Sequence, residues 1–219
     1  MKYYKIIVLS IFLLSTFFLG KVHAKVHNYS LQGKCIYIDP GHGGKDSGAI
    51  SKKFLEKDMN LLLSEKLASI LFNQGAMIYL TRDGDYDLSK STINRKRNDL
   101  YTRANLINKS NCDLYVSIHL NSSPSPRWSG IQVFYSNINK SNKKIATIIT
   151  NQLKQDINNI RDYKKENNYY MYSKIKVPGI LIEAGFISNN RDNYNLRKEE
   201  YQDKLVKSIA DGISIYLNS

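Results

Sequence analysis

The chain has 219 residues, of which 42% are hydrophobic and 23% charged, and its formal net charge is +13. This length, with no Pro/Gly/Ser-rich linker and no internal repeat, suits one domain with a sizeable core and argues against an array of modules. A basic charge suits nucleic acid, wall polymers or anionic lipid as partners, and equally a solvated Lys/Asn-rich surface, so charge alone does not assign a function.

The first 24 residues are typical of a secretory signal peptide. Lys2 and Lys5 precede an apolar run at residues 6–20, and residues 22–24 (VHA) place small side chains where a signal peptidase reads. The run is shorter than the roughly 20 residues of a spanning helix, which favours a cleaved signal over an uncleaved anchor. Its removal takes away three lysines and leaves a charge of +10. We therefore predict one exported domain at residues 25–219, with no spanning segment in the mature chain.

Apolar strands and amphipathic helices alternate along this domain. The pattern predicts strands at residues 34–39, 76–82, 113–119, 130–135 and 179–184, with a weaker one at 169–173. It predicts helices at residues 55–71, 95–109, 142–157 and 199–217. Strands separated by helices imply parallel crossovers with helices packed on the sheet faces. The expected fold is a three-layer α/β/α sandwich around a mostly parallel twisted sheet of about six strands.

Two of the four histidines follow predicted strands, while His23 and His27 lie near the end of the signal segment. His42 stands within residues 40–44 (PGHGG), where glycines let the backbone approach a ligand closely, and His119 ends the strand at 113–119. A lone histidine at a strand end is commonly a core or loop residue. Here, however, the carboxyl ends of parallel strands face one crevice, where ligands bind. Both imidazoles are therefore expected to meet there.

His42, Glu56 and His119 together form a candidate zinc site. A catalytic zinc takes three imidazole or carboxylate ligands and leaves the fourth position to water. Glu56 lies in the first turn of the predicted helix, where favourable interaction with the helix dipole is an alternative explanation. Ligand histidines usually donate their other nitrogen to an acceptor, and Asp39 and Asp46 compete for that role.

Glu183 follows the apolar strand at residues 179–184 and is the candidate general base, because a carboxylate outside the metal shell can take the proton of the attacking water. The alternative is a buried structural carboxylate paired with Arg82 or Arg103. Taken alone, these residues indicate metal-assisted hydrolysis of an amide or ester, with no cofactor other than zinc.

Dispersed motifs from about Lys34 to the C-terminus resemble the zinc-dependent N-acetylmuramoyl-L-alanine amidases of the amidase-3 type, which cut cell-wall peptidoglycan. The motifs are residues 38–44 (IDPGHGG), 56–57 (EK), 81–82 (TR), 103–105 (RAN), 117–121 (SIHLN) and 178–189 (PGILIEAGFISN). The resemblance implies that His42, Glu56 and His119 hold zinc and that Glu183 is catalytic. It also implies the substrate, the amide between N-acetylmuramic acid and the L-alanine of the stem peptide.

Residues 126–130 (PRWSG) narrow the resemblance to sporulation amidases of the CwlD type. This implies action on spore-cortex peptidoglycan, leading to muramic lactam formation and needed for germination, at the cell wall or in the forespore intermembrane space. The chain shows no wall-binding repeats, which favours control by an activating partner protein.

Other functions stay open at this point. They are a zinc peptidase that cuts within the stem peptide, a general vegetative cell-wall amidase, and a binding module without catalysis. A nucleic-acid binder is disfavoured because no recognised motif accompanies the charge and the export signal argues against it.

The two cysteines, Cys35 and Cys112, each stand seven residues before a motif histidine. Equal offsets on parallel strands place them at similar heights and on the same side of the sheet. An exported chain can form a disulfide, but parallel side chains on neighbouring strands rarely reach the required torsion. We therefore predict two buried free thiols close to each other, with a disulfide as the alternative.

Overall fold

A computed structural model of the chain describes residues 30–51 and 53–219. The predicted signal segment, with His23, and also His27, lie outside the described residues. Within the described part of the chain, no helix has the length and apolar character needed to cross a membrane.

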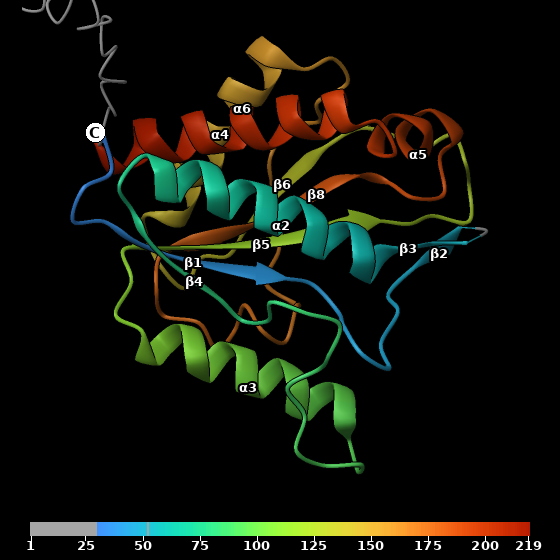
Figure 1. Cartoon of the computed structure of the whole chain (residues 1–219), viewed down its shortest axis with the longest axis horizontal. Helices are drawn as coiled ribbons and strands as arrows, with labels where there is room; N and C mark the ends of the chain where they lie inside the picture. The colour runs from blue at the N-terminus through green and yellow to red at the C-terminus, as the bar shows by residue number, and fades with distance from the viewer. Residues whose placement is uncertain (1–29, 52) are drawn as a thin grey trace, which may run out of the picture.

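The central sheet has six strands, and two short strands form a separate hairpin (Figure 1). The sheet strands are β1 (Cys35–Pro40), β4 (Met77–Leu80), β5 (Leu114–Asn121), β6 (Gln132–Tyr135), β7 (Lys164–Lys165) and β8 (Gly179–Phe186). The hairpin is β2 (Ile50–Ser51) with β3 (Phe54–Leu55). The described helices are α2 (Glu56–Asn73), α3 (Arg95–Lys109), α4 (Asn142–Asp156), α5 (Asn190–Leu196) and α6 (Glu199–Leu217).

The sheet order is β4-β1-β5-β8-β6-β7, and the first four strands are parallel. β6 runs antiparallel to β8 and parallel to β7. Figure 1 shows α2, α4 and α6 on one face of the sheet and α3 on the other. The predicted three-layer sandwich around a mostly parallel sheet is confirmed. β1, β5 and β8 are adjacent, so their carboxyl ends form one edge.

Alternate side chains of the strands enter two separate cores, as the two-residue period of a strand requires. Ile36 and Ile38 of β1 are fully buried in the core beneath α2, whereas Tyr37 between them points to the core beneath α3. Ala104 and Ile107 are the buried positions of α3 in that second core. Burial on both faces fixes the register of the strands, and with it the height at which each strand ends.

The weak strand predicted at residues 169–173 is wrong. The segment folds into consecutive turns, in which the N–H groups of Lys174 and Ile175 donate to the carbonyl of Met171 at 3.0 and 3.2 Å. Aromatic residues favour strands in general, but here Met171 and Tyr172 are both buried. A strand would send these successive side chains to opposite faces, whereas the turn sends both inward. The sixth strand is β7 instead.

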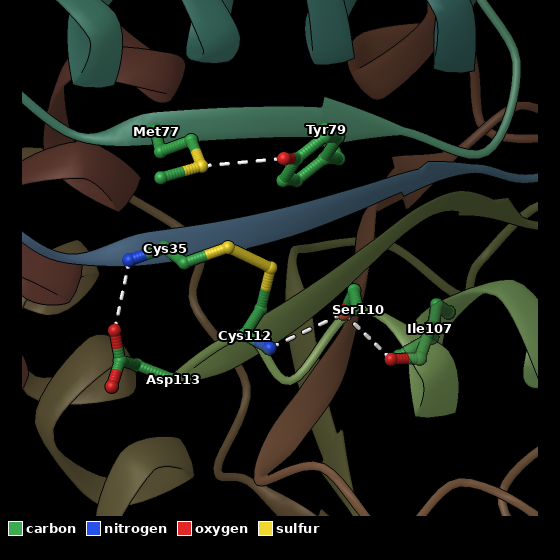
Figure 2. Close-up of a disulfide and its surroundings, with 7 residues drawn as sticks. All are labelled: Cys35, Met77, Tyr79, Ile107, Ser110, Cys112 and Asp113. Carbon is green, nitrogen blue, oxygen red and sulfur yellow. Dashed lines mark hydrogen bonds between the residues drawn. A yellow bond between two sulfur atoms is a disulfide. The ribbon is translucent and has the colours of Figure 1, made fainter.

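The prediction of free thiols is also wrong, although the predicted proximity of the cysteines is right. Cys35 and Cys112 form a disulfide with a Cα–Cα distance of 4.6 Å (Figure 2). The register of β1 on β5 is offset by 78 residues, one more than the separation of the cysteines, so Asp113 lies beside Cys35. Cys112 precedes the first residue of β5, and its N–H donates to Ser110 Oγ. Cys112 therefore lies before the paired part of β5, and its side chain is not held parallel to that of Cys35, which was the argument against a disulfide.

Candidate metal centre and active site

His42 lies in the loop after β1, in the left-handed backbone region at φ 63°. Its Nδ1 is 3.0 Å from Asp46 Oδ2, and its Nε2 is 3.1 Å from Glu56 Oε1. Of the two aspartates considered as acceptors for a ligand histidine, Asp46 is therefore the one that contacts and orients His42. Asp39 contacts Thr81 and Ser117 instead, away from the imidazole.

Glu56 is the first residue of α2, as predicted, and it is buried. Its Oε2 accepts from the N–H of Ala49 at 2.8 Å, and its Oε1 accepts from the N–H of Leu120 at 3.1 Å. These two backbone donors fix the carboxylate between the loop and β5. His119 Nδ1 approaches the same Oε1 at 3.1 Å. The helix-dipole explanation is therefore insufficient, because the carboxylate points to both imidazoles.

His119 stands on β5 beside Gly41, and no side chain could occupy that glycine position. A Cβ on Gly41 would lie 2.2–2.5 Å from ring atoms of His119. Gly48 is equally crowded, since its Cβ would lie 2.5 Å from Glu56 Oε2. The glycines of this loop therefore make room for the two ligand side chains as well as allowing the turn.

The three candidate ligand residues meet as predicted. One ligand atom from each of His42, Glu56 and His119 lies within 4.8 Å of the others. The imidazole rings are edge to face, with centroids 5.0 Å apart. Two imidazoles and one carboxylate are the donor set of a catalytic zinc site with three protein ligands, and the Asp46 contact to Nδ1 of His42 is the usual support for such a ligand. The side chains present fit this metal.

The charges within this group are mutually dependent. Burial opposes protonation of His42, but its hydrogen bonds to Asp46 and Glu56 outweigh that effect and raise the pKa of His42 to about 9. Burial alone would raise the pKa of Glu56, yet the two imidazoles hold it well below its usual range. The ion-free group is thus poised to release a proton from His42 when a metal binds.

Glu183 lies on β8, directly opposite His119 on β5. It is 7% exposed, and among the described residues its Oε2 has no hydrogen-bond partner. Burial, followed by the nearby negative charge of Glu56, raises the pKa of Glu183 to about 8. The alternative of a structural ion pair fails, because Arg82 donates to backbone carbonyls and Arg103 pairs with Asp39 and Asp99.

The two buried arginines instead hold the loop that carries His42. Arg82 donates to the carbonyls of Pro40 and Gly41 at 3.0 and 2.9 Å. Arg103 donates to the carbonyls of Pro40 and His42 at 2.7 and 2.6 Å. Arg82 and Arg103 belong to the sequence motifs but have no assigned part in the reaction. They fix the backbone of the loop that carries His42.

A second buried contact anchors Arg103. Its Nη1 lies 2.9 Å from Asp39 Oδ1. Burial raises the pKa of Asp39, but Arg103 and the hydroxyls of Thr81 and Ser117 outweigh it and hold that pKa below its usual range. Asp39 therefore stays ionised beneath the loop and supports the arginine.

A cavity of about 360 Å³ opens onto the metal group. His42, Glu56, His119 and Glu183 line it together, and so do residues 169–172. Sequence reasoning missed the contribution of residues 169–172, because an aromatic run is typical of a strand. It also missed the backbone support that Ala49 and Leu120 give to Glu56, for which a sequence carries no signal.

The chain is similar to known proteins over most of its length. The family model described as N-acetylmuramoyl-L-alanine amidase, of the amidase-3 type, matches residues 36–215. The germination-specific N-acetylmuramoyl-L-alanine amidase of Bacillus subtilis is 44% identical over 191 residues, which cover 85% of this chain and 81% of that protein.

Two solved structures are similar over most of the chain. The CwlD amidase of Clostridioides difficile, determined in complex with the GerS lipoprotein, has a TM-score of 0.80 and 35% identity, covering 84% of this chain and 98% of that one. The amidase AmiC2 of Nostoc punctiforme has a TM-score of 0.75 and 34% identity, covering 85% and 98%.

Proposed function

Because the chain belongs to the amidase-3 family of N-acetylmuramoyl-L-alanine amidases and is a peptidoglycan amidase, we propose that its cleavage of the muramoyl-L-alanine amide depends on zinc. The proposed ligands are His42, Glu56 and His119. The proposed catalytic base is Glu183. The observation that carries the proposal is a buried carboxylate oxygen of Glu183 without a partner among the described residues, in the cavity onto which the three ligand side chains open.

Zinc bound at these side chains would supply a Lewis acid for the scissile carbonyl and would acidify water. Glu183 takes the proton from the attacking water on its carboxylate and returns it to the nitrogen of the leaving L-alanine. A raised pKa suits this double role, because the group must both accept and donate a proton near neutral pH. Asp46 and the backbone donors around Glu56 keep the ligand side chains in place.

Single substitutions separate the two roles. Alanine at His42, Glu56 or His119 is expected to lower zinc content and turnover together, since the three-ligand site loses its geometry. Glu183→Ala is expected to keep zinc and to lose turnover. Metal analysis and hydrolysis of purified peptidoglycan, with and without chelator, measure both quantities. An ordinary rate in Glu183→Ala would contradict the assignment of the base.

Product analysis tests the bond that is cut. A muramoyl amidase releases peptides with new N-terminal alanine, whereas a zinc peptidase acting within the stem peptide releases other N-termini. Appearance of N-terminal alanine alone is expected.

We further propose that the substrate is spore-cortex peptidoglycan. The support is the 44% identity to an amidase named germination-specific in Bacillus subtilis. Removal of stem peptides would lead to muramic lactam, so loss of the protein is expected to spare vegetative growth and impair germination. Mutant spores with a normal content of muramic lactam would instead favour a general vegetative wall amidase.

An extracytoplasmic lipoprotein is the proposed activating partner. The support is the similar CwlD amidase, which was solved in complex with a lipoprotein. Zinc occupancy and turnover are expected to rise when such a partner is added to the purified chain. Full activity of the chain alone would count against this role.

Export is proposed through residues 1–24, with residues 25–219 as the catalytic domain. A cell-wall substrate requires action outside the cytoplasmic membrane, which supports this division. Sequencing the N-terminus of the exported protein should return Lys25 as the first residue.

A further inference from the structure

A basic recess lies beside the metal centre. Its volume is about 570 Å³, and it is lined by Asn94, Arg95, Lys96, Arg97, Leu100 and Tyr170. Lys96, Leu100 and Tyr170 also line the cavity that contains the candidate ligands and Glu183. The recess is therefore an extension of the active-site cavity, between the start of α3 and the turn that follows Tyr169.

The positive charge of the recess is placed against the helix dipole. Arg95, Lys96 and Arg97 are the first three residues of α3, and the first turn contains no acidic residue. The N-terminus of a helix favours anions and disfavours cations. Arg95 pairs with Asp87, which balances one of the three charges. Lys96 Nζ lies 3.6 Å from Asp46 Oδ2, and Arg97 has no such partner among the described residues, so this turn keeps an excess of positive charge.

Lys96 and Arg97 can both reach a ligand in the recess. The side chain of Lys96 is 66% exposed. Arg97 pairs with no carboxylate among the described residues, and its guanidinium lies 5.3 Å from the centroid of Tyr170. Lys174 approaches the same ring at 5.8 Å. The ring of Tyr170 thus lies close to cations from two segments of the chain, Arg97 and Lys174. Clustered charges of one sign beside a cavity attract ligands of the opposite charge.

An independent feature of the adjoining cavity also indicates a polar ligand. Tyr172 lines it and is 1% exposed, and its hydroxyl has no hydrogen-bond partner among the described residues. A buried hydroxyl normally has a partner, because leaving one unpaired is costly. A bound oxygen acceptor would provide it.

We propose that this recess binds carboxylate groups of the stem peptide, and so acts as a subsite for the acidic peptide that leaves the muramoyl group. The inference rests on the proposed function and adds a specificity-determining site to it. The acceptor on the cavity side is a peptide or carboxylate oxygen, and Lys96 and Arg97 provide the charge.

The reach of the substrate fits this placement. Lys96 Nζ lies 3.6 Å from Asp46 Oδ2, which is itself 3.0 Å from His42 Nδ1. An extended peptide advances about 3.3–3.6 Å per residue. When the scissile amide is at the metal centre, the acidic residue that follows L-alanine therefore comes within reach of Lys96.

Charge removal on both sides of the contact tests the subsite. The substrates are a disaccharide tripeptide with free carboxylates and the same compound with every carboxylate amidated. Lys96→Gln/Arg97→Gln is expected to raise KM for the acidic substrate roughly fivefold to tenfold, as for two partly exposed ion pairs, with kcat unchanged. KM for the amidated substrate should not change. Lys143→Gln/Lys144→Gln, in the first turn of α4, removes the same charge away from the cavity and is the matched control.

A binding measurement separates this inference from the proposed reaction. Calorimetric titration of the zinc-loaded protein with the free acidic tripeptide needs no turnover, and the double variant should weaken that binding by the same factor. Arg97 forms no ion pair with Asp46, unlike Lys96, so Arg97→Gln alone should give part of the effect with zinc content unchanged. Equal effects on acidic and amidated compounds, or tripeptide binding unaffected by both variants, would overturn the subsite. Tripeptide binding without any amide cleavage would contradict the proposed function and would still support the subsite.

Discussion

The buried carboxyl group of Glu183 makes stability depend on pH in a definite direction. Its pKa is about 8 in the fold against 4.5 for the free side chain, so between these values the folded protein holds a proton that the unfolded chain releases. Stability is therefore fully present below pH 4.5 and falls as pH rises towards 8. Glu183→Gln cannot ionise and avoids this loss.

We expect metal-free Glu183→Gln to gain roughly 2–4 kcal/mol over the wild type between pH 5 and pH 9. Urea unfolding in the presence of chelator measures the difference at both values. Glu200→Gln, an exposed carboxylate, is the control and should show no such gain. A constant difference across this range would mean that Glu183 is ionised in the fold throughout.

Asp46 is expected to strengthen metal binding without touching the ion. Its carboxylate holds Nδ1 of His42, which leaves Nε2 directed at Glu56. Asp46→Asn should weaken zinc binding about 10–100-fold, the usual effect of removing such a support. Competition with a chromogenic chelator measures the affinity. Asp162→Asn removes another aspartate from a lysine pair that does not line the cavity, and it should bind zinc like the wild type.

For single residues, the sequence predicts the reactive side chains better than the residues that hold them in place. His42, Glu56, His119 and Glu183 were expected to converge because each follows or precedes a recognisable element, and their side chains do meet in one cavity. Whether Asp46 or Asp39 contacts His42 depends on how the glycine-rich loop turns. Nothing in residue order determines that turn.

Among the elements, the His42 loop and β5 are in close contact at Gly41. A Cβ on Gly41 would meet the ring of His119 at 2.2 Å, and Gly41 does not have a positive φ that would add strain. Gly41→Ala should therefore displace His119 and lower zinc affinity while every ligand is retained. Zinc titration measures this loss. Gly84→Ala, whose Cβ would lie 3.2 Å from the ring of Tyr86, is the matched control.

The Cys35–Cys112 disulfide joins the starts of β1 and β5 across 77 residues. A loop of this length corresponds to at most about 4.5 kcal/mol by the chain-entropy relation. Cys35→Ser/Cys112→Ser should lower the free energy of unfolding by up to that amount, measured in urea. Thiol titration of the denatured, unreduced wild type should detect no reactive thiol. Two reactive thiols would mean that the bridge is absent.

Element prediction succeeded where periodicity was long and failed where segments were short. α2 and α6 extend over many turns, so their apolar spacing was clear. The hairpin of β2 and β3 has two residues in each strand, and no periodicity can be read from so few. The bridge was missed because a shift of one residue in strand register cannot be seen in the sequence.

For the whole molecule, zinc and folding are expected to be linked. A ligand that binds only the folded chain stabilises it by roughly 2.7 kcal/mol at a hundredfold excess over Kd. Zinc should therefore raise the melting temperature of the wild type and of Glu183→Ala, which keeps all three proposed ligands. His119→Ala should show no rise. A rise in all three proteins would place the ion elsewhere.

The overall architecture could be predicted because alternating strands and helices allow few arrangements, and burial of apolar faces selects among them. The sequence did not predict that β6 reverses direction beside β8. That reversal depends on the pairing of β6 with β8, where Gln132 lies opposite Glu183, and no periodicity of the sequence indicates a strand direction.

The strand pair β1 and β5 is fastened at both ends, by the disulfide at one and, with zinc bound, by His42 and His119 at the other. Local opening cannot separate strands that are closed at both ends, so their central amide hydrogens should exchange with solvent only through global unfolding. The amides of Ile38 and Val116 would then report the full stability of the protein. The short edge strand β7 has no such closure, and its amides should exchange through local fraying.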